Sequence, residues 1–151
     1  MGGYINGKRN IFGEEYFGNN VIFRGEYLNG KRHGKGKEYS FDGTLKFEGE
    51  YLYGKKWNGK LYDIHDGTVY KIINGEGFIK EYNNNGTLVF EGEYLKGERN
   101  GTGKEYNDSG KLIFEGEYKN GEKNGKGKEY YYYGEIAFEG EYLNGKRHGK
   151  G

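Results

Sequence analysis

Residues 45–51 read LKFEGEY, and the core of this stretch, FEGEY, returns at Phe90, Phe114 and Phe138. A variant, FRGEY, begins at Phe23. Where the pattern is regular, successive copies begin 24 residues apart. A fixed period of this length is typical of repeat architectures, in which each copy forms one small element stacked on its neighbours. The sequence is therefore interpreted first as a tandem repeat.

The local pattern within one copy predicts β-structure. Apolar residues and glycine alternate with charged residues through residues 45–51, which is the period of two of a half-buried strand. A helix is disfavoured because glycine recurs every few residues, at about 1 kcal/mol each in a helix interior. The segment NGKRHG at residues 29–34 predicts a reversal, and GKGKEY at residues 34–39 predicts the partner strand.

A single hairpin is marginal in water, so neighbouring hairpins must shelter one another. We therefore expect an all-β fold, an elongated and twisted single-layer antiparallel sheet of tandem hairpins. Within a hairpin we expect a four-residue loop over residues 30–33. That register places Tyr27 opposite Gly36, where the ring can lie on bare backbone. It also places Glu26 opposite Lys37, an ion pair worth roughly 0.2–1 kcal/mol.

The repeats fill the chain as one array of about seven, over residues 1–151. The first repeat is degenerate and keeps only the spacing of its Gly and Tyr residues. The third and fourth are degenerate as well, because the pattern between Gly54 and Ile79 contains one insertion and one deletion. The last repeat is truncated at Gly151, inside its GKG segment, which is compatible with a longer protein.

Composition limits the classes of function. Only 32% of the 151 residues are hydrophobic and the mean hydropathy is −1.10, yet 18% are aromatic, which disfavours disorder and predicts a folded chain with a thin core. Lys and Arg number 24 against 23 acidic residues, so the chain lacks the basic excess of a general nucleic-acid binder. There is no cysteine for a disulfide or a thiolate metal site.

The apolar runs are short everywhere. The first 20 residues hold no run long enough for a signal peptide, and no stretch approaches the roughly 18 apolar residues of a membrane-spanning helix. These features predict a cytoplasmic protein.

The repeat resembles the MORN (membrane occupation and recognition nexus) repeat, and the 24-residue spacing is similar to MORN-variant repeats of bacterial proteins. The stretch FEGEYLNGKRHGKG at residues 138–151 carries the aromatic residue, the EGEY core, the NGK turn and the paired glycines of that motif. The resemblance implies a β-sheet rod with an aromatic groove, and a scaffold that binds partner proteins or acidic phospholipids near a membrane or the cytoskeleton. It also implies that a homodimer can form, through a sheet edge or a terminal repeat.

The first functional hypothesis is a non-catalytic scaffold that binds a protein or peptide partner along the aromatic groove. The aromatic side chains assigned to it come from the FEGEY cores, the degenerate repeats and the run of four tyrosines at residues 130–133. They are Tyr51, Tyr53, Trp57, Tyr62, Tyr70, Tyr94, Tyr118 and Tyr132.

The alternative hypothesis is peripheral binding to acidic phospholipid through basic turns, at about 1 kcal/mol per cation near an anionic surface. Its residues lie in the two segments KRHGKGK and KNGKGK. They are Lys31, Arg32, Lys35, Lys37, Lys123, Lys126 and Lys128.

No residue is assigned to catalysis, to a cofactor or to a metal. His33 and His148 occupy a position that holds asparagine in other repeats, which favours a structural turn role. His65 has no motif around it that supplies a nucleophile or a second ligand. The EGEY carboxylates recur too regularly to form a single active site, so the sequence does not predict an enzyme.

Overall fold

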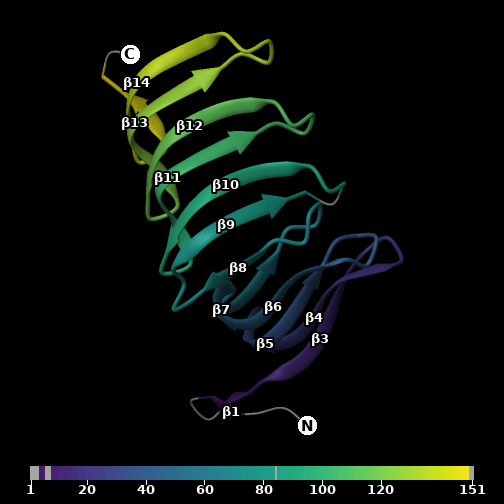
Figure 1. The fold of residues 1–151 in the computed structure, drawn as a ribbon. Coiled ribbons are helices and arrows are strands. Elements are labelled where there is room, and N and C mark those ends of the chain that lie inside the picture. The colour runs from purple at the N-terminus through teal and green to yellow at the C-terminus, as the bar shows by residue number, and fades with distance from the viewer. Residues whose placement is uncertain (1–3, 6–7, 84, 150–151) are drawn as a thin grey trace. The chain divides into compact units, whose positions relative to one another are not determined.

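The computed structural model describes the whole chain except residues 1–3, 6–7, 84 and 150–151. The described residues form β-strands and turns and contain no helix, which confirms the all-β prediction (Figure 1). The chain divides into two compact units, Met1–Glu76 and Gly77–Gly151. Each unit is described separately below.

The first unit contains a two-stranded sheet and a six-stranded sheet, both antiparallel. The larger sheet, called the first sheet, keeps its strands in chain order from β3 to β8. The strands of the unit are β1 (Tyr4–Ile5), β2 (Lys8–Arg9), β3 (Ile11–Phe17), β4 (Asn20–Leu28), β5 (Lys31–Tyr39), β6 (Leu45–Leu52), β7 (Lys55–Tyr62) and β8 (Val69–Ile72).

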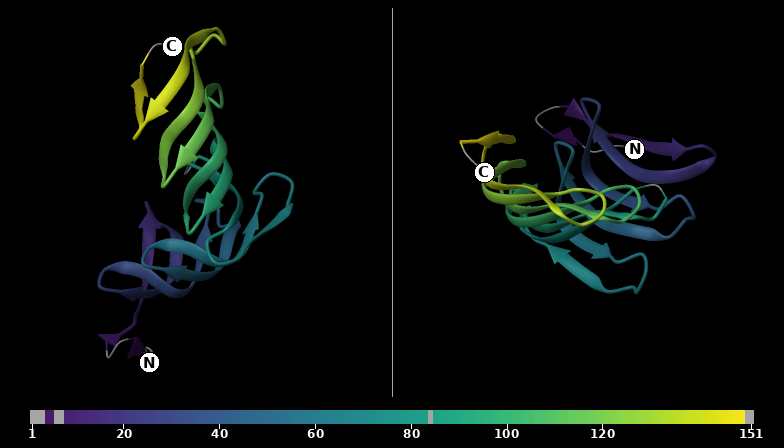
Figure 2. Two further views of the ribbon diagram at one scale, coloured as in Figure 1. Left: turned by 90° about the vertical axis from the view of Figure 1, so that its left-hand side faces the viewer. Right: turned by 90° about the horizontal axis from the view of Figure 1, so that it is seen from above.

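The second unit contains one seven-stranded antiparallel sheet, the second sheet, again in chain order. Two further views show each sheet as a single twisted layer (Figure 2). Its strands are β9 (Gly77–Tyr82), β10 (Leu88–Leu95), β11 (Glu98–Tyr106), β12 (Leu112–Lys119), β13 (Glu122–Tyr130), β14 (Ile136–Leu143) and β15 (Lys146–His148).

The prediction of tandem hairpins is confirmed, but the loop and the register are corrected. Asn29 and Gly30 alone make the turn, with φ of 52° and 79°, the two positive values of a type I′ turn. Because the loop has two residues rather than four, Tyr27 faces Arg32. An irregularity between Gly25 and Tyr27 then shifts the register, so that Gly25 faces Gly36 and Arg24 faces Lys37. The predicted Tyr27–Gly36 pair is therefore wrong.

The predicted Glu26–Lys37 pair is wrong for the same reason. Lys37 faces Arg24 on one side and Glu48 on the other, whereas Glu26 accepts a hydrogen bond from the backbone N–H of Lys35 at 2.7 Å. Opposite charges do face each other across strands, as expected, but with other partners: Glu48 faces Lys37 and Glu50 faces Lys35.

The core of each hairpin is a phenylalanine ring lying on two facing glycines. Phe114 is 1% exposed, and a Cβ built on Gly116 or Gly127 would stand 2.9 or 2.7 Å from its ring. The same Cβ on Gly116 would reach the Cα of Gly127 at 2.7 Å. Glycine is therefore required by close approach of backbone and ring, as the sequence indicated. A tyrosine ring lies close as well, because the Cβ on Gly127 would also stand 2.9 Å from the ring of Tyr142.

The single continuous sheet expected from the sequence is divided between β8 and β9. At this point the facing glycines of the other hairpins are replaced by isoleucines: Ile72 faces Gly59, and Ile79 faces Gly92. Two isoleucines cannot make the close glycine–glycine approach. Between them the turn keeps only one isolated bridge, from Ile73 to Glu76. The number of repeats in the array stays a prediction.

Candidate functional site

The aromatic face, defined as the face that carries the buried phenylalanines, alternates Phe and Glu from strand to strand. In the second sheet each phenylalanine faces a glutamate on both neighbouring strands, or on one neighbour at the end of the series. The ladder runs Glu81, Phe90, Glu105, Phe114, Glu129, Phe138. Along this ladder, apolar and acidic side chains therefore alternate.

Cations from the turns cover the phenylalanine rings. In the second sheet the ammonium of Lys123 lies 4.2 Å from the centroid of Phe114 and 4.0 Å from a carboxylate oxygen of Glu105. In the same way, the guanidinium of Arg99 lies 3.9 Å from the centroid of Phe90. Each cation thus combines a cation–π contact with an ion pair, and the rings beneath are closed off from solvent.

The first sheet repeats this arrangement around Arg32. Its guanidinium carbon lies 4.0 Å from the centroid of Phe23, and its nitrogens contact Glu15 at 2.8 Å and Glu38 at 3.0 Å. Lys56 contacts Glu38 as well, at 3.1 Å. Burial alone would raise the pKa of Glu38, but Lys56, Lys46 and Arg32 lower it to about 2.

Tyrosines complete the aromatic face by donating to the same glutamates. Tyr94, Tyr118 and Tyr142 donate to Glu81, Glu105 and Glu129 respectively. Burial and the acceptor carboxylate raise the pKa of each phenol. The hydroxyl of Tyr51 is buried and has no hydrogen-bond partner among the residues that the structure describes.

The predicted groove residues therefore separate into two groups. Tyr51 and Tyr118 are 4% exposed and belong to the cores of their units, and Tyr94 is partly buried against the cluster that contains Tyr118. Tyr53 is 48% exposed and Tyr132 is 75% exposed. The sequence alone did not separate rings that build the sheet from rings that remain open.

The remaining three candidates are half-buried in the degenerate repeats. The backbone oxygen of Trp57 accepts a hydrogen bond from the N–H of Gly75 at 2.8 Å, and the hydroxyl of Tyr62 donates to Glu48 at 2.7 Å. Tyr70 faces Leu61. All three residues lie on the neighbouring strands β7 and β8 of the first unit.

The turn at residues 131–133 exposes three consecutive tyrosines. The corresponding turn at Asn107 is held by the side-chain oxygen of that residue, which accepts from the N–H of Ser109 and Lys111 at 2.9 and 3.0 Å. Tyr131 cannot act in this way, and its ring instead stacks on Tyr133 at 5.2 Å. The turn at residues 131–133 therefore exposes aromatic rings where the turn at Asn107 has side-chain hydrogen bonds.

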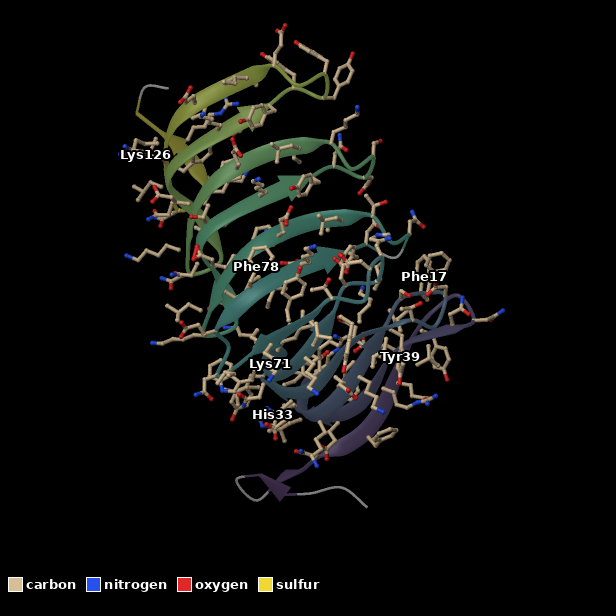
Figure 3. The ribbon with its side chains drawn as sticks, viewed as in Figure 1. Phe17, His33, Tyr39, Lys71, Phe78 and Lys126 are labelled. Atoms are coloured by element: carbon tan, nitrogen blue, oxygen red, sulfur yellow. The ribbon has the colours of Figure 1, made fainter. Side chains whose placement is uncertain are left out.

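The predicted lipid-binding cations also differ in their surroundings. Arg32 and Lys123 lie over phenylalanine rings on the aromatic face, and Lys128 lies 3.9 Å from Glu139. The other four are exposed, and Figure 3 shows Lys126 extending away from the strands. They are Lys31, Lys35, Lys37 and Lys126.

The histidine–asparagine position of the turn joins one repeat to the next. His33, at the turn end of β5 in Figure 3, accepts the backbone N–H of Tyr53 on its Nδ1 at 3.0 Å. Asn58, Asn100 and Asn124 accept the corresponding N–H of the following turn at 2.9, 3.3 and 3.5 Å. This confirms the turn role of His33 and gives it a function, because it supplies the acceptor for a residue held at positive φ.

The reverse face, opposite the aromatic face, carries a ladder of charges, for which the sequence predicted opposite-charge pairs but with the wrong partners. In the second sheet the charges alternate strictly in sign, and Tyr106 and Tyr130 donate to the glutamates at 2.5 and 2.6 Å. The positions are Lys80, Glu91, Lys104, Glu115, Lys128 and Glu139. In the first sheet they are Glu14, Arg24, Lys37, Glu48, Lys60 and Lys71.

The described part of the chain contains no group of three or more His, Cys, Asp or Glu side chains suited to hold a metal ion. Nor do the described residues include a helix that is long and apolar enough to cross a membrane.

Stacked two-stranded hairpins, phenylalanines seated on glycine pairs and turns joined by His or Asn define a β-hairpin repeat protein. Comparison with protein families matches the MORN repeat at residues 23–45, 90–111, 114–134 and 138–151, just over half of the chain. The chain belongs to the MORN-repeat family. The search of curated proteins found no match.

Proposed function

We propose that this chain is a non-catalytic scaffold that binds a protein or peptide partner. MORN repeats are commonly associated with scaffolds that bind proteins or membranes, which supports the general class. The observation that carries the proposal is the exposed aromatic turn at residues 131–133. Tyr132, at 75% exposed, leaves a large apolar ring in water where the corresponding turn at Asn107 holds Asp108, and exposed aromatic patches are typical of interaction surfaces.

The binding surface in this proposal is narrower than the groove predicted from the sequence. Cations and tyrosine–glutamate hydrogen bonds already cover the phenylalanines of the aromatic face. A partner would therefore contact rings that remain open: the tyrosines of the turn in the second unit or, as a separate surface in the first unit, the exposed Tyr53 and the half-buried Trp57.

The test is a peptide array followed by titration of any captured peptide against the intact chain. We expect saturable binding that falls at least about tenfold, a loss of about 1.4 kcal/mol, in Tyr132→Ala or Trp57→Ala. Leu143→Ala is the matched control, because this residue is 46% exposed in the same sheet as Tyr132 and is not part of the surface. Absence of any saturable ligand, or equal loss in the control, would contradict the proposal.

The alternative is binding to acidic phospholipid through the four exposed lysines, Lys31, Lys35, Lys37 and Lys126. Flotation with anionic vesicles at low and high salt separates the two functions, because an electrostatic interaction of exposed charges weakens as salt rises. Strong salt-sensitive flotation without peptide binding would favour the lipid function.

A further inference from the structure

The reverse face of the first sheet contains a hollow of about 620 Å³ above the glycines of β4, β5 and β6. Its walls are charged side chains from these three strands, with an aromatic residue at either end, Phe12 and Tyr39. The charged residues are Arg24, Glu26, Lys35, Lys37, Glu48 and Glu50. Arg24 and Tyr39 also line a second, smaller hollow that extends to Phe41.

The charge ladder is irregular at this hollow. Arg24 is the arginine of the variant FRGEY, and Glu91, Glu115 and Glu139 hold its position in the second sheet. As a result Arg24 faces a second cation, Lys37, whereas the equivalent lysine of the second sheet, Lys104, lies between two glutamates.

Tyr39 loses its acceptor through the same change. Its counterparts Tyr106 and Tyr130 donate to the glutamate of the neighbouring FEGEY core at 2.5 and 2.6 Å. Tyr39, at the far end of β5 from His33 in Figure 3, has Arg24 in place of that glutamate, and its hydroxyl makes no hydrogen bond within the described residues. A phenol, a guanidinium and an ammonium thus line one hollow.

Residues of its own sheet accept only part of the hydrogen bonds that the Arg24 guanidinium can donate. Its Nε donates to Glu14 at 2.6 Å, and its side chain is 50% exposed. A guanidinium has five N–H donors, so its terminal nitrogens are available to a second acceptor. The Lys37 ammonium makes no ion pair within the part of the chain that the structure describes.

The local charge differs sharply from that of the matching surface in the second sheet. Three cations and three glutamates wall the hollow. The corresponding positions of β10 to β12 hold one lysine, four glutamates and a threonine: Lys104, Glu91, Glu93, Glu115, Glu117 and Thr102. An acidic ligand would be repelled from the second surface and is tolerated only on the first.

We propose that this hollow docks an acidic segment of a partner protein, whose carboxylate takes the place of the glutamate that Arg24 replaces. The carboxylate would accept from Arg24, Lys37 and Tyr39, and apolar neighbours in the segment would contact Phe12 and Phe41, which are 64% and 38% exposed. This inference rests on the proposed scaffold function and names a docking site and a partner chemistry for it.

The experiment titrates the intact, isotope-labelled protein with acetyl-Phe-Gly-Glu-Gly-Phe-amide and with its glutamine analogue, followed by NMR at low salt. We expect saturable shifts at Arg24, Lys37 and Tyr39 with the glutamate peptide, and binding at least about tenfold weaker with the analogue, because charge-assisted hydrogen bonds are lost. Equal binding of the two peptides, or no saturable shift, would overturn the proposal.

Two variants make the assignment specific. Arg24→Glu restores the FEGEY sequence that the other repeats fold with, so it should stay folded and lose the glutamate-dependent binding. Glu91→Arg should create a second set of shifts around Lys104 and Tyr106. Retention of binding in Arg24→Glu would overturn the site, and so would binding to anionic vesicles that depends on Arg24 while the peptide does not bind.

A failure of the docking-site proposal can be distinguished from a failure of the scaffold function. If Arg24→Glu leaves untouched the binding of a peptide that Tyr132→Ala abolishes, the docking site is wrong and the scaffold stands. If the wild-type chain binds neither the array peptides nor the acidic probe, both are wrong.

Discussion

Each of the two sheets has an aromatic face of the same construction, and the sheets differ on the reverse face. Phe47 of the first sheet and Phe114 of the second are equally buried, and each is seated on a glycine pair. On the reverse face, the second sheet alternates charge along its ladder, whereas the first sheet breaks the alternation twice, at Arg24–Lys37 and at Lys60–Lys71. The difference teaches that the phenylalanine–glycine contact is what the fold requires, while the charges opposite it can change without loss of the strands.

The largest expected effect comes from removing the buried phenylalanine ring that both sheets seat on a glycine pair. Phe114→Ala and Phe47→Ala should each lower the free energy of unfolding of their own unit by about 3–5 kcal/mol, since a buried ring leaves a cavity over two glycines. Chemical denaturation followed by residue-resolved NMR measures each unit separately. A loss below about 1 kcal/mol in either variant would contradict an equivalent core in the two sheets.

The next effect tests the glycines. Gly103→Ala and Gly36→Ala should each cost about 1–3 kcal/mol, because the new methyl group would overlap the phenylalanine ring. The built Cβ lies 2.8 Å from the Phe90 ring at Gly103 and 2.7 Å from the Phe23 ring at Gly36. Thr102→Ala, an exposed neighbour on the same strand, is the control and should stay within about 0.5 kcal/mol of the wild type. A neutral Gly103→Ala would refute the close packing.

The turn contacts sharpen the comparison, because the two sheets use different side chains. His33→Ala should cost about 1–2 kcal/mol by leaving the N–H of Tyr53 without its acceptor, and His33→Asn should recover most of that loss. Asn124→Ala should cost less, about 0.5 kcal/mol, since its bond is longer at 3.5 Å. Thermal unfolding of the three variants checks the order. Equal losses for His33→Asn and His33→Ala would exclude the acceptor role.

The smallest effect concerns pH. The pKa of Glu38 is lowered from its ordinary 4.5 to about 2 in the folded protein, so its stabilisation is complete above 4.5 and disappears as the pH falls towards 2. Glu38→Gln should therefore be less stable than the wild type at neutral pH, by about 1 kcal/mol, and equally stable near pH 2.

Glu129→Gln provides the matched control for this pH effect. Its partner Arg147 is 52% exposed, so its contribution should be smaller. Denaturation midpoints measured from pH 7 to pH 2 give the comparison. A difference in denaturation midpoint between Glu38→Gln and the wild type that stays constant across that range would contradict the predicted pH effect of Glu38.

Strand type and repeat length could be predicted from the sequence because the alternation in residues 45–51 and the 24-residue spacing are both local patterns. The register was predicted wrongly. The Asn29–Gly30 pair is a strong signal for a two-residue turn and would have given the Tyr27–Arg32 pair, but it does not give the irregularity that sets Gly25 opposite Gly36. The division of the sheet was also readable in principle, since Ile72 and Ile79 stand at glycine positions.

The candidate site was less predictable. Whether a tyrosine is buried or open depends on the cation and glutamate that the neighbouring repeat brings to it, as at Tyr118, and not on its own flanking residues. The sequence shows that Arg24 stands in FRGEY where the other repeats have the glutamate of FEGEY. Only the register shows that this arginine faces Lys37. The register therefore links the fold to the function.

The facing of glycine against glycine is tested most directly by proton NOEs between Hα atoms. The account predicts strong Hα–Hα cross-peaks between Gly116 and Gly127 and between Gly25 and Gly36, with the glycine signals shifted by the phenylalanine rings above them. Cross-peaks that instead join Tyr118 to Gly127 and Tyr27 to Gly36 would contradict it.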